Sequence, residues 1–281
     1  MTFSVVSWTL GITDVDPLVA KLKTLGLDGV QYAGDHRDVD PDELRRKAQE
    51  AGIAIIAIDP FNAAPSNPDQ ASAAMAIEYY KRVVDFAVMT GDVPVTLHGL
   101  SLWTRNCRDA ASARQRLVEC CQAVDTYARE RGIRTLYEVC NHYEVPLIHT
   151  AEQCRALIDE IGGDNMGMIL DSFHMNINEP DPLRTLRAHA RKLAIYHISD
   201  SNRGGIGGGH IDFAAQHAVL KEEGFEGEVA VEPVLAHLTP STPPATSEDQ
   251  RQLDREITKS AATWRDYEMA INVGKQEGSL R

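Results

Sequence analysis

Residues 169–180 read ILDSFHMNINEP, where the apolar run MGMIL (166–170) ends directly in Asp171. A carboxylate at the end of a buried run is costly unless a cation or a hydrogen-bond donor pairs with it. The same pattern occurs three more times: RTLYE ends at Glu138, LAIYH at His197 and EVAVE at Glu232. The gaps between the four residues are 33, 26 and 35 positions. Each gap is about one strand–helix unit, so neighbouring parallel strands would bring the four side chains to one edge.

The whole chain alternates short β-like runs with helical patterns. Strands are predicted at 3–8, 28–32, 53–58, 93–97, 134–138, 166–170, 193–198 and 228–232, and helices at 40–52, 72–89, 109–132, 150–163 and 252–274. Eight strand–helix units in 281 residues predict a (β/α)8 TIM barrel, one domain over 1–281 with a C-terminal helix. A doubly wound open sheet is the alternative. It usually carries a Gly-rich turn after its first strand, whereas the sequence there is WTLGITDVD.

Two long loops follow predicted strands. They are PFNAAPSNPD (60–69) and AHLTPSTPPATS (236–247), the second with Pro240, Pro243 and Pro244. Active sites of barrels are built from the loops at the carboxyl ends of the strands. The second loop is therefore expected to be a lid at the rim or a contact between subunits.

Composition excludes several classes of protein. The formal net charge is −13, with 41 acidic and 28 basic residues, which argues against a nucleic-acid partner. No apolar run approaches the roughly 18 residues of a membrane span, and MTFSVVSWTL lacks the basic start of a signal peptide. The five cysteines, at 107, 120, 121, 140 and 154, form no Cys-x-x-Cys motif. They indicate a reducing, cytoplasmic compartment in which cysteine serves as a small apolar residue.

The four strand-end residues form an oxygen-rich ligand set with one nitrogen. One carboxylate after a strand is commonly a loop residue or a helix cap, but four in register are harder to obtain by accident. The set Glu138, Asp171, His197 and Glu232 suits a hard or borderline divalent ion, Mn²⁺ first, with Mg²⁺ or Co²⁺ as alternatives. Structural zinc would require cysteine or more histidine. We therefore predict one divalent metal ion.

Four motifs in the order YEVCNHYE (137–144), LDSFHMNINE (170–179), HISDSNRG (197–204) and VEP (231–233) resemble the xylose isomerase-like barrel superfamily of sugar isomerases and epimerases. The similarity is closest to ketose 3-epimerases of the D-tagatose/D-psicose type and covers residues 134–235. It implies that Glu138 and Glu232 are the acid/base pair as well as metal ligands. It also implies that Glu144, His174 and Arg203 contact substrate or support the catalytic carboxylates. Such enzymes are expected to be dimers or tetramers.

One residue departs from the resemblance, and several others near strand ends are open to two interpretations. Gln31, in DGVQYAGD, stands where a glutamate is expected, which weakens any transfer of substrate preference. His98, Trp8 and Trp103 follow strands and are candidates for the substrate wall, with packing in the core or a loop as the alternative. The run RGGIGGGH (203–210), with His210, is either a phosphate-binding loop or a flexible turn.

The predicted activity is epimerisation of a free ketose at C3. Removing the C3 proton gives an enediolate, whose charge a cation stabilises, and inversion needs a base on one face and an acid on the other. An aldose–ketose, keto-inositol or sugar-phosphate isomerase would use the same site. A nuclease of the endonuclease IV type shares the fold, but IAIIAIDPF offers no histidine at the end of the third strand. A barrel that only binds sugar or metal is the remaining alternative.

Overall fold

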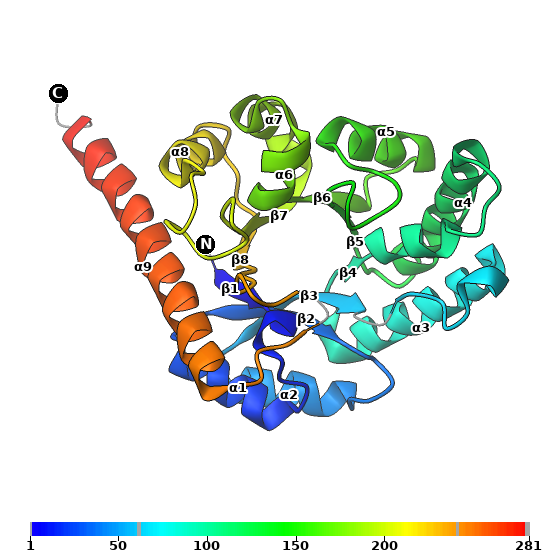
Figure 1. Cartoon of the computed structure of the whole chain (residues 1–281), viewed down its shortest axis with the longest axis horizontal. Helices are drawn as coiled ribbons and strands as arrows, with labels where there is room; N and C mark the ends of the chain where they lie inside the picture. Colours follow the sequence, from blue (N-terminus) through cyan, green and yellow to red (C-terminus); the bar gives the residue numbers. More distant parts are fainter. Residues whose placement is uncertain (1, 61–62, 240–241, 279–281) are drawn as a thin grey trace.

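The computed structural model describes residues 2–60, 63–239 and 242–278, with side chains described up to residue 270. Eight parallel strands form one closed barrel in sequence order, β8 pairing with β1 (Figure 1). The strands are β1 (Phe3–Val6), β2 (Gly29–Gly34), β3 (Ala54–Pro60), β4 (Val95–Thr96), β5 (Thr135–Val139), β6 (Met166–Asp171), β7 (Leu193–Ile198) and β8 (Glu228–Val231). The predicted (β/α)8 barrel is confirmed.

Two predicted strands are too long, for local reasons. Residues 7–10 form a 3-10 helix, η1 (Ser7–Leu10), instead of continuing β1. There the Ser7 hydroxyl accepts the Ala33 N–H at 2.8 Å and the Thr9 hydroxyl donates to the Val6 carbonyl at 3.0 Å, so side chains compete with the strand ladder. β4 has two residues because Pro94 has no N–H to donate and η3 (His98–Thr104) follows closely.

Helices surround the barrel, and several of them start at capping residues that the sequence offers. They are α1 (Val15–Thr24), α2 (Pro41–Ala51), α3 (Ala73–Gly91), α4 (Ala110–Arg129), α5 (Ala151–Ile161), α6 (Ser172–Asn178), α7 (Pro182–His189), α8 (Phe213–Glu222) and α9 (Ser247–Gly278), with short 3-10 turns η2 (Pro68–Gln70) and η4 (Ala190–Lys192). Asp40 and Thr150 accept backbone N–H groups at the starts of α2 and α5. α9 begins five residues before the predicted start, because Thr246 and Asp249 bond each other's backbone N–H.

The apolar core has two layers. A small cluster fills the inside of the barrel and consists of Val6, Ile56, Ala57, Leu136, Ile169, Ile195 and Ala230. A larger cluster lies between the strands and the helices and includes Cys120, Cys121 and Cys154. All five cysteines are free, and Cys107 alone of them is not buried. The inner cluster supports the floor below the polar residues that follow the strand ends.

α9 spans the side of the barrel between α1 and α8 (Figure 1). Asp254 forms an ion pair with Lys21 of α1 at 2.5 Å, and Glu268 pairs with Lys221 of α8 at 2.8 Å. Between these contacts, Trp264 stacks on Tyr196 of β7 with ring centroids 5.6 Å apart. No described helix has the length and apolar character that crossing a bilayer requires.

Candidate metal centre

Four consecutive strands, β5 to β8, deliver the four predicted ligands to the mouth of the barrel. Glu138 lies in β5, Asp171 ends β6, His197 lies in β7 and Glu232 directly follows β8. One potential ligand atom from each residue lies within 4.8 Å of the others, and all four residues are buried. The spacing along the chain has therefore become proximity in space, because parallel strands of a barrel end at one rim.

His197 lies among the carboxylates. Its Nδ1 is 3.2 Å from Oε1 of Glu138 and 3.7 Å from Oε2 of Glu232. The two carboxylate oxygens of Asp171 have different surroundings. Oδ1 accepts the N–H groups of Phe173 at 2.6 Å and His174 at 3.1 Å, and so caps α6. The other oxygen, Oδ2, is buried without a hydrogen-bond partner among the described residues, as is Oε2 of Glu232.

These unpartnered oxygens fit a cation. A buried carboxylate oxygen without a donor carries the full cost of desolvation, and a divalent ion removes that cost. Three carboxylates and one imidazole are the donor set that Mn²⁺, Mg²⁺ or Co²⁺ takes. The residues present therefore form a possible buried metal site, which also explains why the run MGMIL can end in Asp171.

The surroundings push the pKa values of the two glutamates in opposite directions. Burial raises the pKa of Glu138, but the adjacent His197 outweighs burial and holds it well below its usual range. Burial, and then the charge of Glu138, raise the pKa of Glu232 well above its usual range. Burial raises the pKa of Asp171 to about 6, against the opposing charges of Arg203 and His197. One glutamate is therefore a carboxylate at a pH where the other is a carboxylic acid.

The surroundings shift the pKa values of His197 and of the nearby His174 in opposite directions. Burial lowers its pKa, but the charges of Glu138, Glu232 and Asp171 together raise it to about 9. In contrast, burial and the charge of Arg203 lower the pKa of His174 to about 3. His174 is therefore neutral at physiological pH, while His197 must lose a proton before it can bind a metal ion.

The predicted substrate-contact residues form a connected network beside this cluster. Arg203 donates from Nη1 to Glu144 at 2.6 Å and lies over the ring of Phe173 at 4.5 Å. Glu144 also accepts from the Nδ2 of Asn141, and the same Nδ2 lies 2.8 Å from Nδ1 of His174. Nδ1 of this neutral imidazole is then the acceptor, so Nε2 carries the hydrogen. Sequence reasoning did not single out Asn141 and Phe173, although each stands within three residues of a predicted ligand.

The three residues proposed for the substrate wall lie in different surroundings. Trp8 donates from Nε1 to Oε1 of Glu232 at 2.7 Å, so it contacts the cluster directly. Nδ1 of His98 is 3.7 Å from Oε2 of Glu138. Trp103 is buried, donates to the Ala63 carbonyl and packs against Tyr79, which places it in the apolar layer around the rim.

The Gly-rich run 203–210 is organised by a single carboxylate. Asp200 accepts the backbone N–H groups of Ser201, Gly207, Gly209 and Ile211 at 2.7 to 3.1 Å. These bonds lower the pKa of Asp200 against the effect of burial. His210 is held outside the cluster by a 2.8 Å contact with the Ser201 hydroxyl. These amides are thus engaged within the protein rather than presented to a phosphate.

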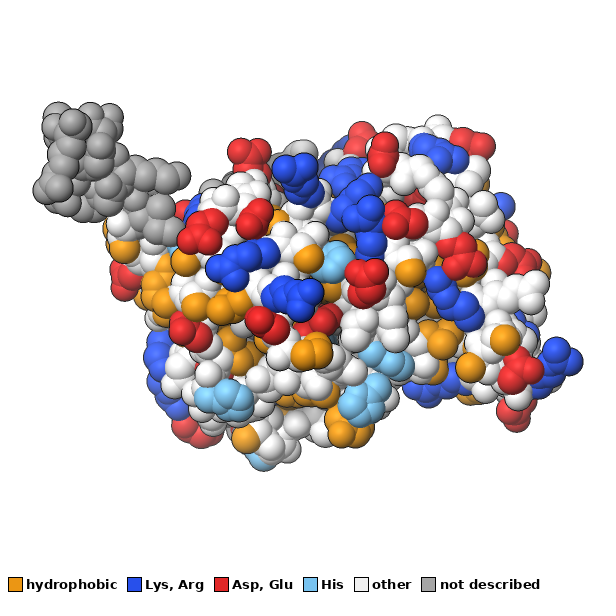
Figure 2. All heavy atoms as spheres, turned by 90° about the horizontal axis from the view of Figure 1, so that it is seen from above, with side chains coloured by type: hydrophobic (Ala, Val, Ile, Leu, Met, Phe, Trp, Pro, Cys, Tyr) orange, Lys and Arg blue, Asp and Glu red, His pale blue; other side chains and the backbone are white. Residues whose placement is uncertain are grey.

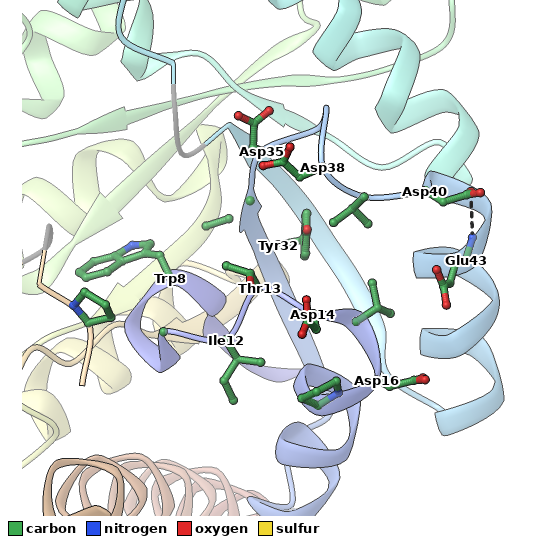
Figure 3. A pocket seen from close by; sticks show the side chains of 17 residues that line it. Trp8, Ile12, Thr13, Asp14, Asp16, Tyr32, Asp35, Asp38, Asp40 and Glu43 are labelled. Atoms are coloured by element: carbon green, nitrogen blue, oxygen red, sulfur yellow. Dashed lines mark hydrogen bonds between the residues drawn. The ribbon is translucent and has the colours of Figure 1, made fainter. Parts of the chain in front are cut away.

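A groove of about 740 Å³ runs from Trp8 along the ends of β1 and β2 (Figure 3). Several carboxylates line this groove, and two of them make structural contacts. Asp40 caps α2, and Asp16 forms an ion pair with Lys47 at 2.5 Å. Pro243 of the loop after β8 also lines the groove, next to Gly11. The predicted rim loop 236–247 therefore does line a cavity, whereas its Pro240 lies outside the described residues.

The surface carries no continuous basic stripe on the face shown in Figure 2, where acidic and basic side chains are interspersed. The described residues also contain a second group that could hold a metal ion, His98, Glu138 and Cys140. It shares Glu138 with the four-residue cluster.

Fold and site together define a (β/α)8 barrel with a possible metal centre at the carboxyl ends of its strands. The chain belongs to the xylose isomerase-like TIM barrel family, whose model matches residues 19–256. It is 29% identical to an L-ribulose 3-epimerase of Mesorhizobium japonicum over 90% of this chain and 82% of that protein. It is 27% identical to a D-psicose 3-epimerase of Agrobacterium fabrum over 78% of this chain and 79% of that protein.

A solved structure supports the same fold. The D-psicose 3-epimerase of Clostridium cellulolyticum H10, determined with D-tagatose, superposes with a TM-score of 0.80. The match covers 95% of this chain and 99% of that one at 21% sequence identity. The homologues are thus ketose 3-epimerases, which are isomerases, and the predicted resemblance is confirmed.

Proposed function

We propose that this protein is a divalent-metal-dependent ketose 3-epimerase acting on a free sugar, with Glu138 and Glu232 as the acid/base pair. The observation that carries the proposal is the buried cluster of Glu138, Asp171, His197 and Glu232, whose ligand atoms lie within 4.8 Å of one another. Within it the pKa values of the two glutamates shift in opposite directions. Epimerisation at a carbon next to a carbonyl requires a base and an acid at the same pH, on opposite faces of the substrate. The relatives support the choice of a ketose and of C3.

The proposed roles follow from the surroundings of each residue. Glu138 is the group that is already ionised, so it removes the C3 proton in one direction, and Glu232 delivers a proton to the other face. In the reverse direction the two exchange roles. Trp8 donates from Nε1 to Oε1 of Glu232 at 2.7 Å and so orients this carboxyl group. A divalent ion, Mn²⁺ in our proposal, supplies stabilisation of the negative charge that develops on the sugar oxygens.

Glu138, Asp171, His197 and Glu232 would hold the ion, and a second set of residues would hold the sugar. His174, neutral and with Nε2–H free of Asn141, can donate to a sugar oxygen, and Arg203 offers a buried Nε without a partner among the described residues. Glu144 orients Arg203. Trp8 and His98 lie beside Glu232 and Glu138, where they could contact the sugar. Trp103 is the weakest candidate for a substrate contact, because it is hydrogen-bonded to the Ala63 carbonyl in the apolar layer. The engaged amides of the Gly-rich run favour a free sugar over a phosphate ester.

Proton NMR in D₂O tests the proposal. The Mn²⁺-loaded protein is incubated with free ketoses, their phosphates and a keto-inositol, and the metal is removed before recording. We expect deuterium at C3 together with the new epimer. Glu138→Gln and Glu232→Gln are expected to lose turnover by about 10²–10⁴-fold, while Glu130→Gln, at the exposed residue that follows α4, retains it.

Other outcomes would identify the alternatives. Deuterium at C1 or C2 with an aldose product would make the protein an aldose–ketose isomerase, and exchange on the keto-inositol alone would make it an inosose isomerase. Metal analysis is expected to give one ion per chain, and three zinc ions would favour the nuclease. Turnover that survives Glu232→Gln would contradict the acid/base assignment. We propose a cytoplasmic homo-oligomer, a dimer or tetramer, which size-exclusion chromatography with light scattering checks.

A further inference from the structure

Gln31 of β2 lies inside the barrel and contacts His197 of β7, a predicted metal ligand, across the barrel interior. The residue has no exposed surface, and its Oε1 is 2.8 Å from Nε2 of His197, a residue 166 positions later in the chain. The register between β2 and β3 shifts between Val30 and Gln31. Such irregularities re-aim side chains near functional sites. A buried amide in this place requires an explanation, because polar groups are costly inside a barrel.

The contact decides which nitrogen of His197 faces the carboxylates as a ligand. Nδ1 points to Glu138 and Glu232, at 3.2 and 3.7 Å, whereas Nε2 points to Gln31. A neutral imidazole carries one hydrogen, and a metal ion can bind only the nitrogen without it. If the amide oxygen of Gln31 accepts Nε2–H, the lone pair of Nδ1 is left for the ion.

The orientation of the amide itself depends on this contact. The Nε2 of Gln31 is buried and has no hydrogen-bond partner among the described residues. His197 is therefore the partner that selects which end of the amide faces the ring. An amide is also uncharged, so it accepts the hydrogen bond without adding a fourth negative charge beside Glu138, Asp171 and Glu232.

We propose that Gln31 is a positioning residue of the metal centre, whose side-chain carbonyl holds His197 in the tautomer with hydrogen on Nε2 and the lone pair of Nδ1 toward the metal ion. This inference rests on the metal site of the proposed function and extends it to a residue that touches neither ion nor sugar. It also gives a physical reason for a glutamine in β2. Its side-chain carbonyl accepts the hydrogen bond from His197, and it adds no negative charge to the cluster.

The first test measures metal affinity rather than turnover. Free Mn²⁺ is quantified by electron paramagnetic resonance during titration of the chelator-treated protein. Gln31→Met has similar volume but no acceptor, and we expect Mn²⁺ to bind it about 10–100-fold more weakly. Gln31→Glu restores an acceptor oxygen and is expected to bind at least as tightly as the wild type. Gln49→Met, on the exposed side of α2, is the matched control and should leave the affinity unchanged.

The second test observes the tautomer directly. In the Zn²⁺-loaded, ¹⁵N-histidine-labelled wild type, NMR should show a His197 Nε2–H protected from exchange with water, and no Nδ1–H. The signal is assigned by its loss in His197→Gln. Because this measurement uses the wild type, it decides the tautomer even if Gln31→Met fails to fold. In a folded Gln31→Met variant the protection should be lost.

The outcomes separate this inference from the proposed function. A wild type that binds Mn²⁺ and turns over sugar, with a Gln31→Met variant of equal affinity, would refute the role of Gln31 alone. An Nδ1–H on His197 in the Zn²⁺-loaded protein would do the same. A wild type that binds no Mn²⁺, or one whose binding is indifferent to Glu232→Gln, would overturn both the inference and the metal site.

Discussion

Replacing Glu232 by glutamine should make the metal-free barrel more stable and the enzyme inactive. The ligand atoms of the cluster lie within 4.8 Å of one another, where two unit charges repel by roughly 3.5 kcal/mol at an effective dielectric constant of about 20. This repulsion, added to burial, is what raises the pKa of Glu232. Glutamine has the shape of the protonated acid, and its carbonyl can still accept the 2.7 Å bond from Trp8.

The sign of the effect follows from proton linkage. A carboxyl group whose pKa is raised in the folded state contributes stability below its unfolded pKa, and that contribution is lost as the pH rises toward the folded pKa. Glutamine does not titrate. Relative to the variant, the metal-free wild type therefore loses about 1.4 kcal/mol for each pH unit above the ordinary glutamate value. At pH 6.5, two units above 4.5, Glu232→Gln should therefore be more stable than the wild type, by at most roughly 2.7 kcal/mol.

Urea unfolding in the presence of a chelator measures this difference, since urea does not screen charges as guanidinium does. The stabilities should converge near pH 4.5 and diverge toward pH 6.5, while Glu130→Gln follows the wild type throughout. Mn²⁺ at 100 times its dissociation constant stabilises the wild type by about 2.7 kcal/mol and should stabilise the variant much less. A metal-free Glu232→Gln that is no more stable than the wild type at pH 6.5 would refute the reasoning.

Three further predictions concern the metal, a loop and the last helix. Because the pKa of His197 is raised to about 9, metal binding near pH 7 should release protons and tighten as the pH rises toward 9; calorimetry in buffers of different ionisation enthalpy counts the protons, and equal heats would contradict this. Asp200→Asn removes the charged acceptor of four backbone N–H groups in and beside the Gly-rich run, so the protein should lose about 1.5–3 kcal/mol in urea unfolding and exchange these amides faster. Unchanged exchange would argue against this role of Asp200. Trp264→Ala should lower the free energy of unfolding by about 3–5 kcal/mol, because the ring is buried against Tyr196. Trp264→Phe, which also removes an Nε1 without a described partner, should lower it clearly less, and equal losses would mean that α9 does not depend on this packing.

Much of the site could be predicted because its residues lie at the ends of strands. Asp171 and His197 each follow a run of apolar residues at the spacing of one strand–helix unit, and a closed parallel barrel must bring such residues to one rim. The sequence was a poorer guide where side chains replace backbone partners. The shortening of β1 depends on Ser7, whose hydroxyl bonds Ala33 of the next strand, and no local pattern shows this contact.

The barrel and the four candidate ligands could be predicted from the amino-acid sequence, since both depend on periodic spacing along the chain and on residue type. The chemical differences among those four residues become visible only in the folded barrel. Glu138 and Glu232 are the same amino acid at equivalent positions, yet burial, His197 and mutual repulsion move their pKa values apart. The contacts of Gln31 with His197 and of Trp8 with Glu232 join residues 166 and 224 positions apart. Electrostatic energy and hydrogen bonding depend on distance and desolvation in three dimensions, and these exist only after the barrel has closed.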